Sequence, residues 1–220
     1  MDIHPDHPEL ARLAAEGHVV AYFGYGSLVN PRTLRTKFLG IRRAEAAGWR
    51  RVFLPRDANE EMSLLSVRRD EQAAVHGVVV YDLAAHLPSV DEREAGYARQ
   101  IVDLSRLSIE TPPLENVPVF IYEALAGGPT AEDRQSAILQ SYLDAVMQGF
   151  RMLYGDDGLR RFIEETDGFE TKLWLDRDAP RYARSVALDE GEAAMFDRLV
   201  AARGAIGYPP SDAFAAHLRA

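Results

Sequence analysis

Hydrophobic and polar positions alternate in blocks along the first half of the chain, in a way that predicts short β-strands. The first block, Val19–Gly24, is an unbroken run of β-branched, aromatic and small residues, typical of a buried strand. Polar turn residues separate the later apolar blocks, which predict five more strands: Glu45–Leu54, Met62–Arg68, Ala74–Asp82, Tyr97–Ile109 and Val117–Leu125. Six short strands at this spacing favour a small mixed β-barrel, closed or nearly closed.

The spacing of apolar residues changes to a helical period after the last of these strands. Thr130 has the character of an N-cap, and the helical pattern that follows it runs to Gly155. Other helices are predicted at Arg32–Phe38, near Pro88–Gly96, and at Gly158–Thr166, Glu190–Arg203 and Ser211–Arg219. The predicted fold class is therefore α+β: a mixed barrel of about six strands with inserted short helices and a C-terminal helical extension.

The same pattern predicts three parts of the chain. Residues 1–17 form a polar, proline-containing N-terminal tail, residues 18–150 the barrel domain, and residues 151–220 a helical extension packed on the barrel. Within the barrel, Gly77 interrupts an apolar run and predicts a bulge or a close approach of another backbone.

Composition narrows the classes of function. Hydrophobic residues make up 47% and charged residues 27%, which is ordinary for a globular protein. The net charge of −9 argues against a nucleic-acid partner. The absence of cysteine excludes disulfides, thiolate catalysis and cysteine-ligated zinc, and the scattered histidines lack ligand spacing. Without a secretory start or an apolar run of membrane length, we expect a cytoplasmic protein with no membrane partner.

The segment Tyr25-Gly26-Ser27-Leu28 directly follows the first predicted strand and is the first candidate site. Glycine adopts backbone angles that other residues avoid, and it allows another molecule to approach the main chain closely. The strand therefore ends in a loop whose backbone N–H groups are suited to binding a carboxylate or a developing oxyanion. An ordinary tight turn is the alternative, because short glycine patterns recur by chance.

A second segment, Val90 to Tyr97, carries three acidic residues within four positions, Asp91, Glu92 and Glu94. Its pattern predicts a short helix that ends at Gly96, followed by a strand. On spacing alone, these acids form a solvated helix face that Arg93 partly neutralises.

Together the two segments resemble the gamma-glutamylcyclotransferase family. The resemblance rests on Tyr25-Gly26-Ser27-Leu28 and on the Asp-x-x-Glu pattern of Asp91 and Glu94, followed by Gly96 and Tyr97. A looser match is Gln140-Ser141-Tyr142, with Gly149 seven residues later. The resemblance covers about residues 18 to 150. It implies that Glu94 is the catalytic carboxylate and that Tyr142 lines the substrate pocket, although Tyr142 also suits the core of an amphipathic helix.

The activity that this resemblance implies is closure of a γ-glutamyl group to 5-oxoproline with release of the attached amine. The substrate's own amine is the nucleophile, so no cofactor or metal is expected. Glu94 is expected to act as general acid and base, and the loop at residues 25–28 is expected to bind carboxylate or oxyanion oxygen. The resemblance leaves open the leaving amine: glutathione, γ-glutamyl amino acids, γ-glutamyl amines and a γ-glutamyl-protected intermediate all fit. It also leaves the oligomeric state open.

Two other functions compete with this hypothesis. A serine hydrolase would use Ser27 as nucleophile, but it needs a nearby base, and His18 lies too far along the same strand. A non-catalytic small-molecule binding module on the same barrel is the other alternative, against which the retained Glu94 argues. The segment Asp176–Arg184, rich in charge, is either a lid whose arginine grips a substrate carboxylate or a solvated connector.

Overall fold

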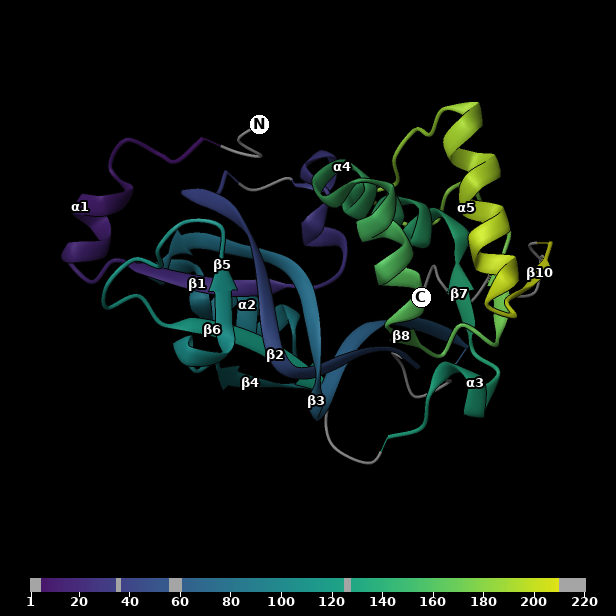
Figure 1. The fold of residues 1–220 in the computed structure, drawn as a ribbon, viewed down its shortest axis with the longest axis horizontal. Helices are drawn as coiled ribbons and strands as arrows, with labels where there is room; N and C mark the ends of the chain where they lie inside the picture. Colours follow the sequence, from purple (N-terminus) through teal and green to yellow (C-terminus); the bar gives the residue numbers. More distant parts are fainter. Residues whose placement is uncertain (1–4, 35–36, 56–60, 125–127, 210–220) are drawn as a thin grey trace.

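The computed structural model of the chain describes residues 5–34, 37–55, 61–124 and 128–209. These residues form one mixed sheet of ten strands with five α-helices. In Figure 1, α4 and α5 lie with β7 and β10 at one end, and α1, β1 and β6 lie at the other. The strands are β1 Val19–Gly24, β2 Gly40–Pro55, β3 Met62–Leu83, β4 Tyr97–Ile101, β5 Leu107–Ile109, β6 Val119–Ala124, β7 Ala137–Leu139, β8 Thr166–Asp167, β9 Lys172–Trp174 and β10 Ile206–Tyr208.

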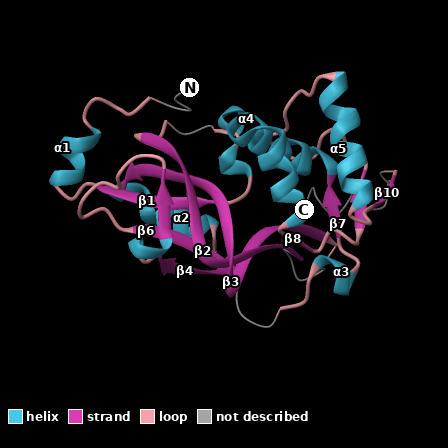
Figure 2. Ribbon diagram, viewed as in Figure 1, coloured by secondary structure: helices cyan, strands magenta, loops and turns pink. Residues whose placement is uncertain are grey.

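The two long α-helices, α4 and α5, both lie in the second half of the chain (Figure 2). The α-helices are α1 Leu10–Ala15, α2 Leu87–Arg93, α3 Ala131–Arg134, α4 Gln140–Glu164 and α5 Glu190–Ala202; the 3-10 helices are Ser27–Val29, Pro31–Thr33, Ala84–His86 and Leu104–Arg106. None of the helices in the described ranges combines the length and the apolarity that a membrane span requires.

β1 is the central strand that positions the candidate loop. It pairs antiparallel with β3, Phe23 opposite Val79, and parallel with β6, Ala21 opposite Val119. All six of its residues are buried, which confirms the prediction made from its unbroken apolar run. The loop at residues 25–28 therefore starts from a strand that is fixed on both sides.

The structure confirms the predicted mixture of strands and helices, but the closed form of the predicted six-stranded barrel is not seen. The main path of the sheet runs β10-β9-β7-β3-β1-β6-β4, and β2 branches from it to pair with β3, β5 and β8. Within the described residues no pairing joins β4 to β5, so the sheet stays open there. Its four additional strands are two or three residues long, too short to give a recognisable apolar pattern.

The two strands predicted at residues 62–68 and 74–82 are one long strand, β3. It pairs with β2 from Pro55–Ser63 to Gly40–Tyr81, and the register shifts between Ala47 and Trp49. Residues 70–73, three of them polar and turn-like in the sequence, form a bulge opposite Gly48. The hairpin therefore continues through a stretch whose composition predicted its end.

Some of the predicted helices and boundaries agree with the structure, and others do not. Gly155, with φ +72°, interrupts α4, which confirms the predicted break between two helical segments. The expected domain boundary at residue 150 falls within α4, and α1 lies within the expected tail. Of the helix predicted over 32–38, the described residues 32–34, 37 and 38 show only the end of the 3-10 turn Pro31–Thr33, and residues 35 and 36 lie outside the described ranges. The helix predicted at residues 211–219 lies outside the described residues.

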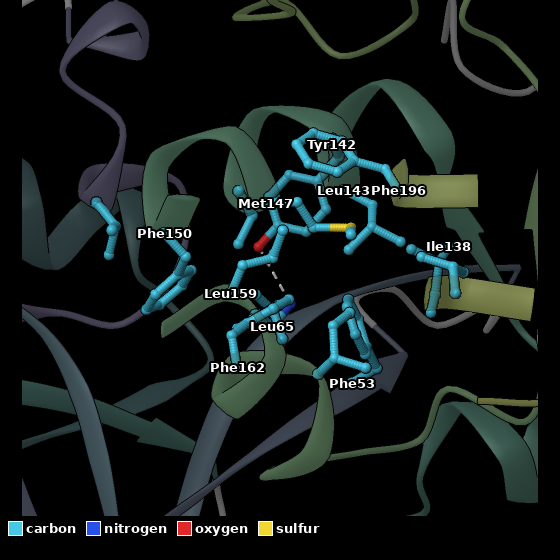
Figure 3. Packing of buried hydrophobic residues seen from close by; sticks show 14 of the residues in the cluster. Phe53, Leu65, Ile138, Tyr142, Leu143, Met147, Phe150, Leu159, Phe162 and Phe196 are labelled. Atoms are coloured by element: carbon cyan, nitrogen blue, oxygen red, sulfur yellow. Dashed lines mark hydrogen bonds between the residues drawn. The ribbon is translucent and has the colours of Figure 1, made fainter. Parts of the chain in front are cut away.

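The main hydrophobic core packs the first half of α4 against β2, β3 and β7. Residues 140–150 are all buried. Aromatic rings form the centre of this cluster: Phe150 stacks on Phe162 with a centroid distance of 4.6 Å, and Phe53 meets Phe169 edge to face at 5.0 Å (Figure 3). Such ring pairs add specific geometry to the burial of apolar area.

The loop after β1 lies directly on α4 through Asn30 and Gly149. Asn30 is fully buried, and its side-chain amide donates to the Ala145 carbonyl at 2.8 Å and to the Gln148 side chain at 3.2 Å. A Cβ at position 149 would lie only 2.7 Å from the backbone nitrogen of Asn30. Glycine at position 149 therefore allows the loop to reach the helix.

We predict that Gly149→Ala destabilises the protein by about 2 kcal/mol, because the added methyl group overlaps backbone that cannot move without breaking the Asn30 contacts. Urea unfolding measures this change. Gly191→Ala is the matched control on α5, because a Cβ there meets only the Asp189 carboxylate, at 3.3 Å. Equal unfolding midpoints for Gly149→Ala and the unmodified protein would contradict the packing argument.

Candidate active site

A cavity of about 660 Å³ lies beside the loop that follows β1. Its size is within the range of small-molecule sites. Three segments far apart in the sequence contribute to its wall: the loop, the end of α2 and the start of α4. The lining includes every residue that the sequence proposed for the site, namely Tyr25, Gly26, Ser27, Leu28, Glu94 and Tyr142.

The loop that lines this cavity has backbone N–H groups without a partner among the described residues. Within the described residues, the N–H groups of Gly26, Ser27 and Leu28 have no hydrogen-bond acceptor, whereas those of Val29 and Asn30 donate to Gly26 and Ser27. Gly77 allows β3 to approach the start of the loop, since a Cβ there would lie 2.2 Å from the Gly24 carbonyl oxygen. The close approach predicted at Gly77 is thus confirmed. Unpaired amides at a concave turn are suited to an anion.

A buried arginine behind the loop fixes its position. The Arg51 side chain donates from Nε to the Tyr25 carbonyl at 2.9 Å and from Nη2 to the His76 carbonyl at 2.5 Å. Its guanidinium carbon lies 4.7 Å from the centroid of Phe150. Burial lowers the pKa of Arg51 to about 9, so the group remains charged at neutral pH.

Glu94 reaches the cavity from the C-terminal end of α2. Its backbone N–H donates to Val90, and Gly96, with φ +104°, turns the chain into β4. Val90 is buried against Tyr22 and Tyr122, which holds α2 on the sheet. Burial raises the pKa of the Tyr25 hydroxyl above its usual range, and the nearby Tyr97 and Glu94 act in the same direction. The half-buried Glu94 is therefore electrostatically coupled to the loop.

Asp91, the other acid of the motif, has a structural role. It accepts hydrogen bonds from the Tyr122 hydroxyl at 2.7 Å and from Arg99 at 2.6 Å. Burial and this carboxylate raise the pKa of Tyr122. Asp91 does not line the cavity, whereas Glu94 does. The two acids of the motif, close in the sequence, therefore have different surroundings.

Tyr142 lies against the loop from the first turn of α4. Its hydroxyl oxygen accepts a hydrogen bond from the Leu65 N–H at 3.3 Å and would lie 3.3 Å from a Cβ at Gly26. Burial raises its pKa well above the usual range, so the hydroxyl stays protonated. The sequence left open whether Tyr142 packs in the core of a helix or lines the pocket. In the structure Tyr142 does both.

Some lining residues were missed by the sequence reasoning. Asp82 and His86 form a pair, with Asp82 Oδ1 2.8 Å from His86 Nδ1. Their four-residue spacing was the available signal, but it spans a strand end and a 3-10 turn. No hydrogen bond joins Ser27 Oγ to His86 in the described part of the chain, whereas a serine nucleophile needs such a base within reach.

The Asp176–Arg184 segment also contributes Tyr182 and Arg184 to the wall. In the described residues, no group of three or more histidines and acids is arranged to hold a metal ion.

Comparison with known proteins finds solved structures that are similar to this one. No family model and no curated protein sequence matches the chain. The structure is similar over most of its length to a gamma-glutamyl cyclotransferase, with a TM-score of 0.48, 13% identity, and coverage of 82% of this chain and 99% of that one.

Two further structures have comparable similarity. An uncharacterized human protein, loc79017, has a TM-score of 0.49 and 15% identity, over 82% of this chain and 99% of its own. A yeast gamma-glutamyl cyclotransferase specific to glutathione has a TM-score of 0.41 and 14% identity, over 84% of this chain and 99% of its own. At these identities and scores, the similarity by itself assigns neither activity nor substrate.

A buried histidine behind the loop predicts how the stability of the protein depends on pH. His76 is buried beside Arg51, and its Nε2 lies 3.0 Å from the Gly158 carbonyl oxygen. Burial, and then the Arg51 charge, lower the pKa of His76 to about 3. In the unfolded chain a histidine titrates near 6.5. Below pH 6.5 the unfolded state therefore binds one more proton, and the free energy of unfolding falls as the pH falls.

We predict that this histidine makes the protein about 1 kcal/mol less stable at pH 5.5 than at pH 8. Denaturant unfolding across this range measures the loss. His76→Gln should remove that part of the pH dependence, whereas His18→Gln, at an exposed position, should retain it. An unchanged pH slope in His76→Gln would refute the assignment.

Proposed function

We propose that the protein is a γ-glutamyl cyclotransferase. The observation that supports this function best is the shared cavity, in which a carboxylate from α2 and unpaired backbone amides from the loop after β1 line one space. Such an arrangement suits a reaction that moves a proton and develops charge on an oxygen. The motif resemblance supports the same activity.

The reaction needs no nucleophile from the protein. The α-amine of the glutamyl group attacks the γ-carbonyl carbon, a new C–N bond closes the five-membered lactam, and the original amide C–N bond breaks. Glu94 accepts the proton that the ammonium loses and returns it to the leaving nitrogen. The loop amides hold the substrate carboxylate or the oxyanion. Orientation of such an intramolecular attack removes roughly 7–11 kcal/mol of the barrier in favourable cases.

Glu94→Gln tests the acid–base role. It keeps the shape of the side chain and removes the proton acceptor, so we predict that release of 5-oxoproline falls about 10²- to 10⁴-fold while the fold is unchanged. The substrates are a panel of γ-glutamyl amino acids, γ-glutamyl amines and glutathione. Glu92→Gln, an exposed neighbour on the same helix, is the matched control and should retain activity. Full turnover by Glu94→Gln would reject the role of Glu94.

The competing serine mechanism makes a different prediction. An activated Ser27 would react with a fluorophosphonate, whereas the cyclotransferase mechanism predicts no covalent adduct. Intact-mass spectrometry after incubation with the reagent distinguishes them. A single adduct that Ser27→Ala abolishes would favour the hydrolase.

The binding-module alternative predicts a third pattern. The unmodified protein would bind γ-glutamyl compounds in calorimetry but release no 5-oxoproline from any of them. That result would replace the catalytic proposal.

A further inference from the structure

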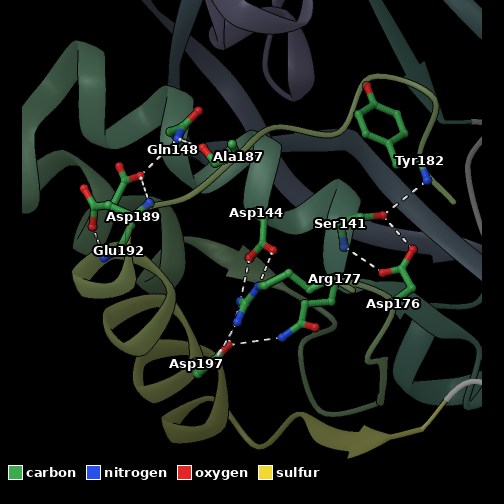
Figure 4. Close-up of polar contacts among 11 residues, drawn as sticks. Ser141, Asp144, Gln148, Asp176, Arg177, Tyr182, Ala187, Asp189, Glu192 and Asp197 are labelled. Carbon is green, nitrogen blue, oxygen red and sulfur yellow. Dashed lines mark hydrogen bonds and ion pairs between the residues drawn. The ribbon is translucent and has the colours of Figure 1, made fainter. Parts of the chain in front are cut away.

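The segment after β9, residues 176–189, is fixed against the start of α4 by buried polar contacts. Asp176 is only 1% exposed, and its carboxylate accepts hydrogen bonds from the Ser141 N–H at 2.8 Å and the Ser141 hydroxyl at 2.6 Å. The Ser141 hydroxyl oxygen in turn accepts from the Tyr182 N–H at 3.2 Å. Figure 4 shows this group beside the contacts of Arg177. The segment is therefore a built part of the cavity wall.

These contacts bring Tyr182 and Arg184 beside the candidate loop. The Tyr182 ring meets the Tyr142 ring edge to face, with 5.1 Å between centroids. The Arg184 guanidinium carbon lies 5.7 Å from the centroid of Tyr182. The Tyr142 hydroxyl in turn lies against Gly26, so Tyr182 and Tyr142 stand between Arg184 and the loop, and all of them line the one cavity.

Arg184 differs from the other charged residues nearby. Arg177, in the same segment, has two carboxylate partners, Asp144 at 2.8 Å and Asp197 at 2.8 Å. Arg184 is half-buried, and in the described ranges its guanidinium has no ion pair or hydrogen bond. It is also the only arginine or lysine among the described lining residues. A cation in this setting is suited to a carboxylate supplied by a ligand.

We propose that Arg184 binds a carboxylate on the leaving half of the substrate, so that the protein selects γ-glutamyl amino acids or peptides over γ-glutamyl amines. This inference rests on the proposed function. In the proposed function, the N–H groups of Gly26, Ser27 and Leu28 bind the anionic oxygen of the glutamyl half. Arg184 comes from a separate segment of the chain and provides a second anion-binding group on the cavity wall. A substrate with a carboxylate on each half would use both groups.

The test uses two substrates that differ only in this carboxylate, γ-glutamyl-alanine and γ-glutamyl-ethylamide. Arg184→Gln should lower kcat/KM for γ-glutamyl-alanine about tenfold or more, mainly through KM, since a charge-assisted hydrogen bond is lost. The effect on γ-glutamyl-ethylamide should be less than about threefold, and Arg184→Lys should lie between Arg184→Gln and the unmodified protein. Arg198→Gln, an exposed position on α5, is the matched charge control and should leave both substrates unaffected.

Equal losses with both substrates would place Arg184 on the glutamyl half and overturn the inference, as would no loss with either. Calorimetry in the Glu94→Gln background separates this inference from the proposed function, because it measures binding without turnover. The inference predicts tighter binding of γ-glutamyl-alanine than of γ-glutamyl-ethylamide, and loss of that preference in the Glu94→Gln, Arg184→Gln double variant. Absence of 5-oxoproline from every compound contradicts the proposed function, whereas absence of this binding preference contradicts the role of Arg184.

Discussion

The candidate site depends on the close contact between the loop after β1 and helix α4. Asn30 bonds to the helix backbone at Ala145, and Gly149 leaves the space that this contact requires. At the other end, β1 is held between β3 and β6. A loop fixed at both ends keeps its amides oriented before any ligand arrives, which reduces the reorganisation that stabilising a developing charge would otherwise need.

The charges around the cavity are separated in a way that fits this interpretation. Arg51, buried behind the loop, donates to the Tyr25 carbonyl, and Arg184 lines the cavity from the segment after β9. Glu94 reaches the cavity from a different element, α2. Positive charge near the amides favours binding of an anion, while a carboxylate elsewhere on the wall is available for proton transfer. The Asp91 carboxylate, held by Tyr122 and Arg99, instead stabilises the turn that carries Glu94.

Much of the site could be predicted because its signals are local. The apolar run of β1, the glycines after it, and the helix end at Gly96 each depend on a few neighbouring residues, and the structure brings their side chains to one cavity. The extent of β3 could not be predicted from local composition, since residues 70–72 are polar yet belong to a bulge inside a continuous strand. The burial of Arg51 was also unpredictable, because arginine is rarely fully buried and its partners here are carbonyl groups and aromatic rings distant in sequence. The path of residues 176–189 depends on the tertiary contact between Asp176 and Ser141, so the sequence left it open whether this segment lines the site.

A crystal structure of the Glu94→Gln variant soaked with γ-glutamyl-alanine tests the central claim most directly. The account predicts that the glutamyl group lies in the cavity with one anionic or carbonyl oxygen on the amides of residues 26–28. It also predicts that the α-amine lies within hydrogen-bond distance of the side chain at position 94. Density for the ligand elsewhere on the molecule, or a glutamyl group in the cavity with its amine turned away from position 94, would contradict the account.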